Sequence, residues 1–335
     1  MFYELAEPSA GGSAARLEPQ TRLHLPFSDK TKGNMTSQTT KPKFRWTART
    51  LTFLFFWWIG GMRPGVVWHY LTDAIHYRLV KLGVLSGTAK HLAEVRAAFE
   101  EQAAKGQFQE RWFDMNIVPW SVTFPKVFKR ADPIRILEIG SWEGRSTLFF
   151  LTYFTQGHMT AVDTWAGSDE WHYHATSDLR DLEARFDHNV SSAPGRVTKR
   201  KGSSLSVLPQ LIDEKQEFDL IYVDGSHFAD DAIVDSLNSW RLLKQGGMMI
   251  FDDVMWPAYP RPRANTAWAI HQFLKYHAGE YKVLHAQYQI ILQKKAAFDD
   301  GLADWVNHPA AAVAVTQSAT NSNHQPEQAH QHSLG

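Results

Sequence analysis

The chain has 335 residues, of which 44% are hydrophobic and 21% are charged, so it can bury a substantial core. Its 35 basic and 35 acidic side chains give a formal net charge of zero, which removes the electrostatic basis for nucleic-acid binding. There are no cysteines, which excludes disulfides and thiolate metal sites and fits a reducing compartment such as the cytoplasm.

The two ends of the chain have the composition of disordered segments. Residues 1–50 carry Ser, Thr, Pro and Gly with little hydrophobic periodicity, and residues 297–335 drift into Ala, Gln, Asn, Ser and His. The folded part is therefore expected between them. It divides into a hydrophobic and amphipathic helical segment over 51–106 and a globular domain over 107–296.

Residues 51–68 are an apolar stretch with two interpretations. The run from Leu51 to Met62 follows several basic residues and is rich in Phe and Trp, which suits peripheral contact with a membrane. It is shorter than the roughly 20 apolar residues that a spanning helix needs. The alternative is a hydrophobic helix that packs on the domain or on a second subunit of a homodimer. The sequence leaves open whether this cytoplasmic protein associates with a membrane.

Two further segments precede the domain core. Residues 86–105 are predicted to form an amphipathic helix, because Leu92, Val95 and Phe99 share one face. The aromatic segment from Trp112 to Trp120 is expected either to pack as a helix over the edge of a sheet or to form a lid on a cofactor pocket.

From residue 134 apolar strands alternate with helices. Strands are predicted at 134–139, 159–163, 197–201, 218–223 and 248–251, a helix at 264–277, and two more strands at 281–285 and 289–293. This alternation predicts an α/β fold with a Rossmann-like, doubly wound and mainly parallel seven-stranded sheet. The last two strands are predicted to form a C-terminal β-hairpin.

Polar side chains follow the predicted strands at the point where each ends. In sheets of this kind, ligands bind at the carboxyl ends of the strands. The sequence therefore predicts one site, built from Glu138, Asp163, Ser204, Asp224, Asp252 and Asp253.

The turn after the first strand carries Gly140 and Gly144. Their spacing is G-x-x-x-G, whereas a dinucleotide site has G-x-G-x-x-G, so an NAD-dependent oxidoreductase is disfavoured. Asp163 follows the glycine turn by about 20 residues, where a carboxylate accepts the ribose hydroxyls of an adenosine cofactor. The alternative role of Asp163 is to cap the next turn.

Five motifs together resemble the class I S-adenosylmethionine-dependent methyltransferases. More closely, they resemble the small methyltransferase domains related to catechol and caffeoyl-CoA O-methyltransferases. The resemblance covers roughly residues 108–295, and its motifs are Leu137–Thr147, Val162–Trp165, Phe186–Val190, Tyr222–His227 and Phe251–Asp253.

The resemblance implies S-adenosylmethionine as cofactor. The residues that it assigns to cofactor binding are Glu138, Gly140, Trp142, Gly144, Ser146, Asp163, Ser204 and Asp224. Among these, Glu138 supports the glycine loop or meets the amino group of the cofactor, and Ser204 lies on the adenine side. Trp165 is expected either near the adenine or in the core.

The resemblance also implies a divalent cation, with Mg²⁺ the expected ion. In the related enzymes an Asp after the fourth strand, and an Asp and an Asn after the fifth, hold Mg²⁺, which assigns the metal to Asp224, Asp252 and Asp253. The Asn position is Asp253 here, a departure that adds negative charge. Three converging carboxylates also favour a cation on physical grounds, because they would otherwise repel one another.

His227 stands where the related enzymes carry a lysine that helps to deprotonate the substrate. Histidine titrates near neutrality, so His227 is predicted to be catalytic together with Asp224. Its alternatives are a metal ligand and an ordinary surface histidine.

The predicted function is a metal-assisted O-methylation of a small-molecule hydroxyl. A metal-independent or N-directed methyltransferase and a non-catalytic, membrane-attached module stay open beside it. The acceptor pocket is expected from residues 108–122, 164–178 and 254–266. Aromatic and basic side chains there are Trp171, His172, Tyr173, His174, Trp256, Tyr259, Arg261 and Arg263.

Overall fold

The protein is described from a computed structural model, which covers residues 63–167, 179–256, 259 and 261–295. The expectations for residues 1–50, for 297–335, and for the apolar run up to Met62 lie outside this range. Among the described helices, none combines the length and the hydropathy required to cross a bilayer.

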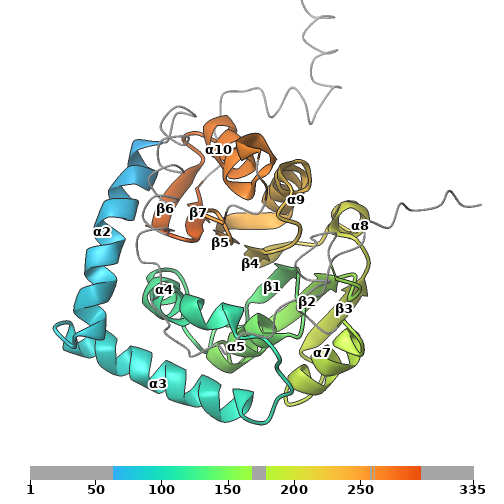
Figure 1. Cartoon of the computed structure of the whole chain (residues 1–335), viewed down its shortest axis with the longest axis horizontal. Coiled ribbons are helices and arrows are strands. Elements are labelled where there is room, and N and C mark those ends of the chain that lie inside the picture. The colour runs from blue at the N-terminus through green and yellow to red at the C-terminus, as the bar shows by residue number, and fades with distance from the viewer. Residues whose placement is uncertain (1–62, 168–178, 257–258, 260, 296–335) are drawn as a thin grey trace, which may run out of the picture. The chain divides into compact units, whose positions relative to one another are not determined.

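The centre of the fold is a seven-stranded sheet with the order β3-β2-β1-β4-β5-β7-β6 (Figure 1). The first five strands run parallel, while β7 pairs antiparallel with β5 and with β6, as the predicted hairpin requires. The strands are β1 Arg135–Ile139, β2 His158–Asp163, β3 Val197–Lys201, β4 Phe218–Val223, β5 Leu243–Phe251, β6 Tyr281–Ala286 and β7 Ile290–Lys294. The predicted Rossmann-like fold is confirmed.

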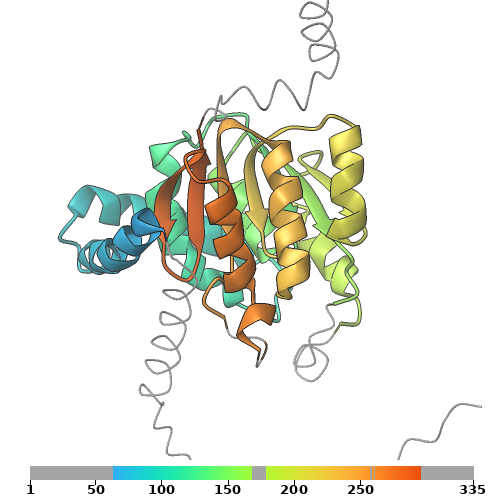
Figure 2. The ribbon, with the colours of Figure 1, turned by 90° about the horizontal axis from the view of Figure 1, so that it is seen from above.

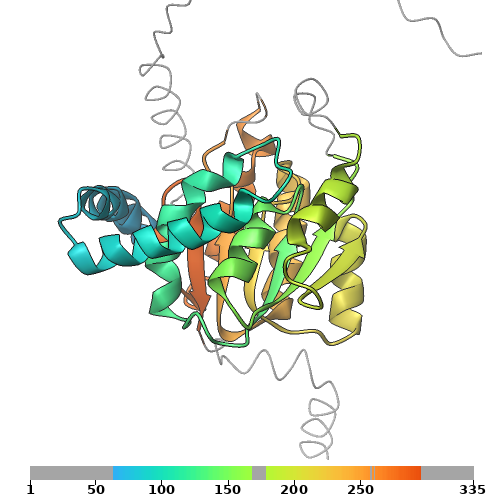
Figure 3. The same ribbon diagram turned by 90° about the horizontal axis from the view of Figure 1, so that it is seen from below.

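Helices cover both faces of the sheet, as Figures 2 and 3 show from opposite sides. One face carries α3 Ser86–Ala103, α4 Ile117–Thr123, α5 Arg145–Tyr153 and α7 Leu182–Val190; the other carries α8 Ser204–Asp213, α9 Ala229–Leu242 and α10 Thr266–Tyr276. Alternate strand residues enter the two cores: Tyr222 packs on the α5 side and Val223 on the α9 side. Both faces are therefore buried, which explains why the strands read as continuous apolar runs.

The segments before the sheet pack on this domain. Helix α2, Pro64–Lys81, lies along the edge strand β6, where Asp73 Oδ2 accepts from the backbone N–H of Ala286 at 3.1 Å. Val95 and Phe99 of α3 are buried in the core beside α5. Short 3₁₀ turns, Trp112–Asn116 and Phe124–Lys126, flank α4, and a third spans Pro262–Ala264.

Two local expectations differ from the structure. No helix was predicted between the third and fourth strands, where α8 lies, and α8 contains Pro209, a residue type that favours a break within a helix. Here the break does not occur, and Ser203 caps the helix by accepting from the N–H of Leu205. Strand β5 begins at Leu243 and not at the predicted residue 248, so Gly246, with φ of 79°, lies within it.

Candidate active site

A cavity of about 490 Å³ opens at the carboxyl ends of β1, β2, β4 and β5. This volume lies within the range of small-molecule and cofactor sites. It is lined by Glu110, Trp112, Phe113, Met115, Asn116, Gly140, Ser141, Trp142, Glu143, Arg145, Ser146, Asp163, Tyr222, Asp224, Gly225, His227, Asp252, Asp253, Trp256 and Tyr288. Most of the predicted site residues are therefore brought to one place.

Gly140 is required by the close approach of two strand ends. Its φ is 85°, and a Cβ added there would lie 1.9 Å from the backbone oxygen of Asp224. Gly144 has φ of 78° and would bring a Cβ to 2.9 Å from the ring of Phe186. The first glycine thus lets the β1 turn pass directly against the end of β4, and both turns face the same cavity.

Glu138 supports this turn from below the cavity. Its side chain is fully buried, and it accepts hydrogen bonds from Ser146 Oγ at 2.5 Å and from the Thr147 hydroxyl. Burial raises the pKa of Glu138 to about 7, although these hydroxyl groups lower it. Glu138 does not line the cavity, so of the two predicted roles the structure favours support of the loop.

Asp163 binds the glycine turn and also lines the cavity. Its Oδ2 accepts from the backbone N–H groups of Ser141 and Trp142, both at 2.8 Å, and its Oδ1 accepts from that of Trp165 at 2.6 Å. Burial raises the pKa of Asp163 despite these hydrogen bonds. The carboxylate therefore shapes the turn, and its place at the cavity wall leaves the predicted contact with ribose as a prediction.

The two tryptophans of these loops have different roles. Trp142 lines the cavity, 5.7 Å from the ring of Trp112, whereas Trp165 is buried, packs on Phe186 and donates from Nε1 to the Trp142 carbonyl. Trp165 thus belongs to the core, which decides between its two predicted positions. Trp142 and Trp165 have φ of 46° and 49°, a region that non-glycine residues adopt mainly where surrounding contacts enforce it.

Ser204 is separate from the cavity. It begins α8, and its hydroxyl donates to Asp235 Oδ2 of α9 at 3.0 Å. Since Ser204 is not among the cavity-lining residues, its placement does not support the predicted contact with adenine.

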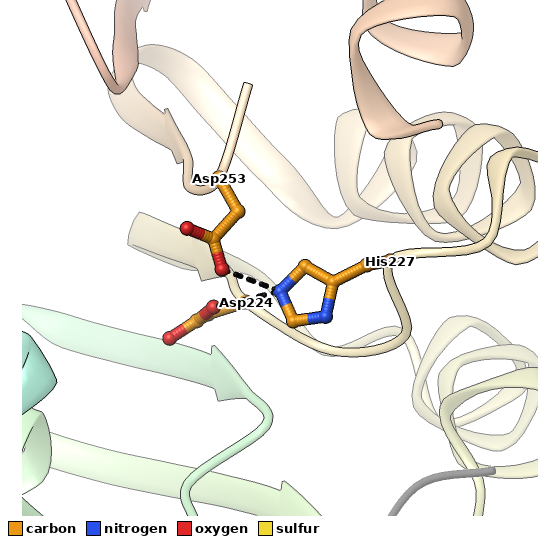
Figure 4. A group of neighbouring side chains, drawn as sticks. All are labelled: Asp224, His227 and Asp253. Atoms are coloured by element: carbon orange, nitrogen blue, oxygen red, sulfur yellow. Dashed lines mark ion pairs between the residues drawn. The ribbon is translucent and has the colours of Figure 1, made fainter. Parts of the chain in front are cut away.

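Asp224, His227 and Asp253 form a compact cluster at one end of the cavity (Figure 4). Nε2 of His227 lies 2.5 Å from Asp253 Oδ2 and 3.9 Å from Asp224 Oδ1, and one ligand atom from each residue falls within 4.8 Å of the others. The His227 ring is buried and meets the Trp256 ring edge-on at 4.5 Å. Burial raises the pKa of Asp253, but the charge and hydrogen bond of His227 outweigh burial and lower it overall.

Asp252 is bound to protein groups on nearly every side. Its Oδ2 accepts from Asn116 Nδ2 at 3.0 Å, from Gln289 Nε2 at 2.8 Å and from the Tyr222 hydroxyl, and its Oδ1 accepts from the N–H of Asp253. Gln289 is held in turn by Trp120 Nε1, which donates to its Oε1 at 2.7 Å. Asp252 therefore lies beside the compact cluster, while Asp224 and Asp253 present their carboxylates to His227.

The carboxylates of Asp224 and Asp252 share one hydroxyl proton. Tyr222 lies within hydrogen-bonding distance of both, yet a tyrosine has a single O–H to donate. Burial, followed by the charges of Asp252 and Asp253, raises the pKa of Asp224 well above its ordinary value, and burial raises that of Asp252 to about 6. Carboxyl groups whose pKa values are raised in this way favour the protonated form unless a cation lies beside them. The carboxylates and imidazole nitrogen of the site fit a divalent cation, with Asp224, His227 and Asp253 as the nearest set.

The segment before β1 forms one wall of this cavity. Trp112 and Met115 are about half exposed at the cavity, while Trp120 is fully buried. Arg145 anchors the wall, since its Nε and one terminal nitrogen donate to the two carboxylate oxygens of Asp114 at 2.6 and 2.9 Å. The segment therefore packs on the domain and lines the cavity, and its predicted role as a lid stays a prediction.

Sequence reasoning missed Asn116, Tyr222, Tyr288 and Gln289. One signal was available for Tyr222, because it lies two residues before Asp224 on a strand and so projects from the same face. Of the predicted acceptor residues, Trp256 lines the cavity and Tyr259 packs on Phe228, whereas Trp171, His172, Tyr173 and His174 lie outside the described residues.

Comparison with known proteins identifies the domain. A family model described as a methyltransferase domain matches residues 137–254, which run from β1 past the end of β5. Residues 137–254 are therefore similar to a methyltransferase domain. The strand order and cavity of the chain are those expected from the class I S-adenosylmethionine-dependent resemblance, which is thereby confirmed.

Two curated proteins are similar to parts of this chain. O-methyltransferase hkm8 of Aspergillus hancockii is 32% identical over 123 residues, which are 36% of this chain and 43% of that protein. Uncharacterized protein R132 of Acanthamoeba polyphaga mimivirus is 23% identical over 158 residues, which are 46% of this chain and 67% of that protein. The chain thus spans less than half of the length of hkm8.

Solved methyltransferase structures are similar at low identity. The MycE methyltransferase of the mycinamycin pathway, in complex with Mg and S-adenosylhomocysteine, is 17% identical, with a TM-score of 0.42 over 63% of this chain and 56% of that one. An O-methyltransferase of Bacillus cereus with S-adenosylhomocysteine is 19% identical, with a TM-score of 0.40 over 62% of this chain and 91% of that one.

Proposed function

We propose that the protein transfers a methyl group from S-adenosylmethionine to a hydroxyl group of a small molecule, with a divalent cation at the acidic cluster. The observation that supports this proposal most directly is that the glycine turn and the acidic cluster line the same cavity. The glycine turn with Asp163 lines it beside Trp142, and Asp224, His227 and Asp253 line it at the ends of β4 and β5.

The cofactor half of the cavity fits a sulfonium amino acid. Gly140 lines the cavity and lets the turn pass against the end of β4, and the position of Asp163 suits the hydroxyl groups of a ribose. S-adenosylmethionine supplies a methyl group on a positively charged sulfur. Buried carboxylates and aromatic faces around the cavity favour such a cation.

The acceptor half supplies a base and a place for the metal. Asp224 and Asp253, with Asp252 beside them, would hold a divalent cation, which would lower the pKa of a hydroxyl group at the site; His227 would then act as the base and not as a third ligand. Nε2 of His227 faces these carboxylates and is buried. His227 accepts the proton of the acceptor hydroxyl at this nitrogen, and the oxygen forms its bond to the methyl carbon as the carbon–sulfur bond breaks. Trp256 and Tyr288 exclude water, and much of the rate comes from positioning.

Turnover tests this assignment. The full chain is incubated with S-adenosylmethionine and a panel of phenols, sugars and hydroxylated natural products, and S-adenosylhomocysteine release is measured with Mg²⁺ and with a chelator. We expect release that requires Mg²⁺ and falls at least 100-fold in His227→Asn. His158→Asn is the matched control, because His158 is exposed at the opposite end of the sheet.

Each alternative has its own outcome. Undiminished turnover in chelator would indicate a metal-independent methyltransferase, and a methylated amine would indicate an N-directed one. If His227→Asn turned over as fast as His158→Asn, the role of His227 as the base would be wrong.

A further inference from the structure

Helix α2 has a row of exposed apolar side chains on one side. Trp68, Leu71 and Ile75 are 66%, 61% and 62% exposed, and Leu82, directly after the helix, is 76% exposed. Their spacing of three, four and seven residues puts them on one side of the helix. We call these four residues the α2 stripe.

The opposite side of α2 already has its partners in the domain. Val66 and Val80 are buried, and Asp73 is held by His285 Nδ1 at 3.0 Å and by the N–H of Ala286. Figures 1 and 2 show α2 beside β6 at the edge of the sheet. The α2 stripe is therefore not the face that docks the helix. A surface helix normally carries polar residues there, and a contiguous exposed apolar row marks an interaction site.

Charge decides which partner suits this surface. The α2 sequence has one carboxylate, Asp73, and that carboxylate points to β6. The exposed charges beside the stripe are the cations Arg78 and Lys81. In the sequence the helix directly follows the apolar run Leu51–Met62, which is itself preceded by Lys41, Lys43, Arg45 and Arg49.

We propose that the α2 stripe docks on the surface of a membrane that contains anionic lipids. Trp68, Leu71 and Ile75 enter the boundary between headgroups and acyl chains, and Arg78 and Lys81 meet lipid phosphates and carboxylates. A second copy of the chain is the less favoured occupant. A two-fold contact would bring two sets of cations into one interface, with Asp73 of each copy already bound to β6.

Vesicle flotation tests the proposal on the full chain. Phosphatidylcholine vesicles with and without phosphatidylserine are used, and the bound fraction is measured for the wild type and for the triple variant Trp68→Gln, Leu71→Gln, Ile75→Gln. We expect binding only to vesicles with phosphatidylserine, and a loss of at least about tenfold in the triple variant. A second variant, Arg78→Glu with Lys81→Glu, is expected to lose the dependence on phosphatidylserine together with most of the binding.

A matched triple variant controls for loss of apolar surface elsewhere. Val234→Gln, Leu237→Gln and Tyr276→Gln change exposed apolar residues of α9 and α10 and are expected to float like the wild type. The proposal is overturned if the wild type does not float, if the α2 triple variant floats equally well, or if that variant changes the molar mass in light scattering and leaves flotation unchanged. The last result would identify a second copy as the partner. Binding of S-adenosylmethionine, measured on the same variants, reports on the proposed function separately.

Discussion

At the scale of single residues, Gly140 is the position that this site depends on most sharply. Two separate features of Gly140 disfavour a side chain there: its positive φ, and the short distance from an added Cβ to the backbone at the end of β4. Several other described glycines have a positive φ but have open space around them. Gly140 links the cofactor turn to the strand that carries Asp224, so the two halves of the cavity meet there.

We expect Gly140→Ala to destabilise the protein by more than about 3 kcal/mol, because the added Cβ must displace the backbone of Asp224. Gly195→Ala is the matched control. Gly195 has φ of 73° with open space around it, so the change there costs about 1 kcal/mol of backbone strain. Urea unfolding of both variants measures the difference. Equal losses of stability would contradict the close approach.

Glu138 is expected to make the free energy of unfolding depend on pH. Its pKa rises from an ordinary value of 4.5 to about 7 in the folded state, so its contribution to stability is present below pH 4.5 and is lost as pH rises through 7. We expect Glu138→Gln to gain on the order of 3 kcal/mol relative to the wild type between pH 4.5 and pH 8. Asp213→Asn, at an exposed position, is the control. Urea unfolding across this range measures it, and a difference independent of pH would contradict the assignment.

At the scale of elements, the wall formed by residues 112–123 combines a buried core contact at Trp120 with the ion pair between Arg145 and Asp114. Arg145 is buried beneath the wall and contacts the rings of Phe99 and Phe108 as well as the carboxylate of Asp114. The wall also supplies Asn116 to Asp252, so the order of this element and the geometry of the acidic residues are linked.

Asp114→Ala is expected to cost about 2 kcal/mol, since the buried guanidinium of Arg145 loses its charged acceptor. It should also speed amide exchange in residues 112–123 and weaken cofactor binding. The control is Glu101→Ala, which breaks the exposed pair with Lys105 and should change stability by only a few tenths of a kcal/mol. Urea unfolding measures the loss of stability, and hydrogen exchange measures the protection of residues 112–123. Unchanged protection of these residues in Asp114→Ala would contradict the role of the ion pair in ordering the wall.

The strands and their carboxyl ends were the part of the fold that the sequence could predict. Strand β2 ends at Asp163, and the apolar ends of β4 and β5 are followed directly by Asp224 and Asp252, so the convergence of these three carboxylates could be predicted. The partners of Asp252 could not, because Asn116 is 136 residues away in the chain and no local spacing records that contact. Helix α8 was not predicted; it packs on the sheet through Val207, Leu208 and Leu211 although it contains Pro209.

At the scale of the whole molecule, one domain combines a cofactor turn, an acidic cluster and an exposed apolar helix. The first two share a cavity, and the third lies at the sheet edge beside β6. The two proposals therefore make independent predictions: changes to the α2 stripe should leave the cavity intact, and changes to the cavity should leave vesicle binding intact.

Calorimetric titration of the full chain with S-adenosylmethionine, and separately with NAD, tests the central claim most directly. We predict one site for S-adenosylmethionine, a loss of at least tenfold in affinity in Asp163→Ala, and no heat with NAD. Binding of NAD, or the absence of S-adenosylmethionine binding to a folded wild-type protein, would contradict the account.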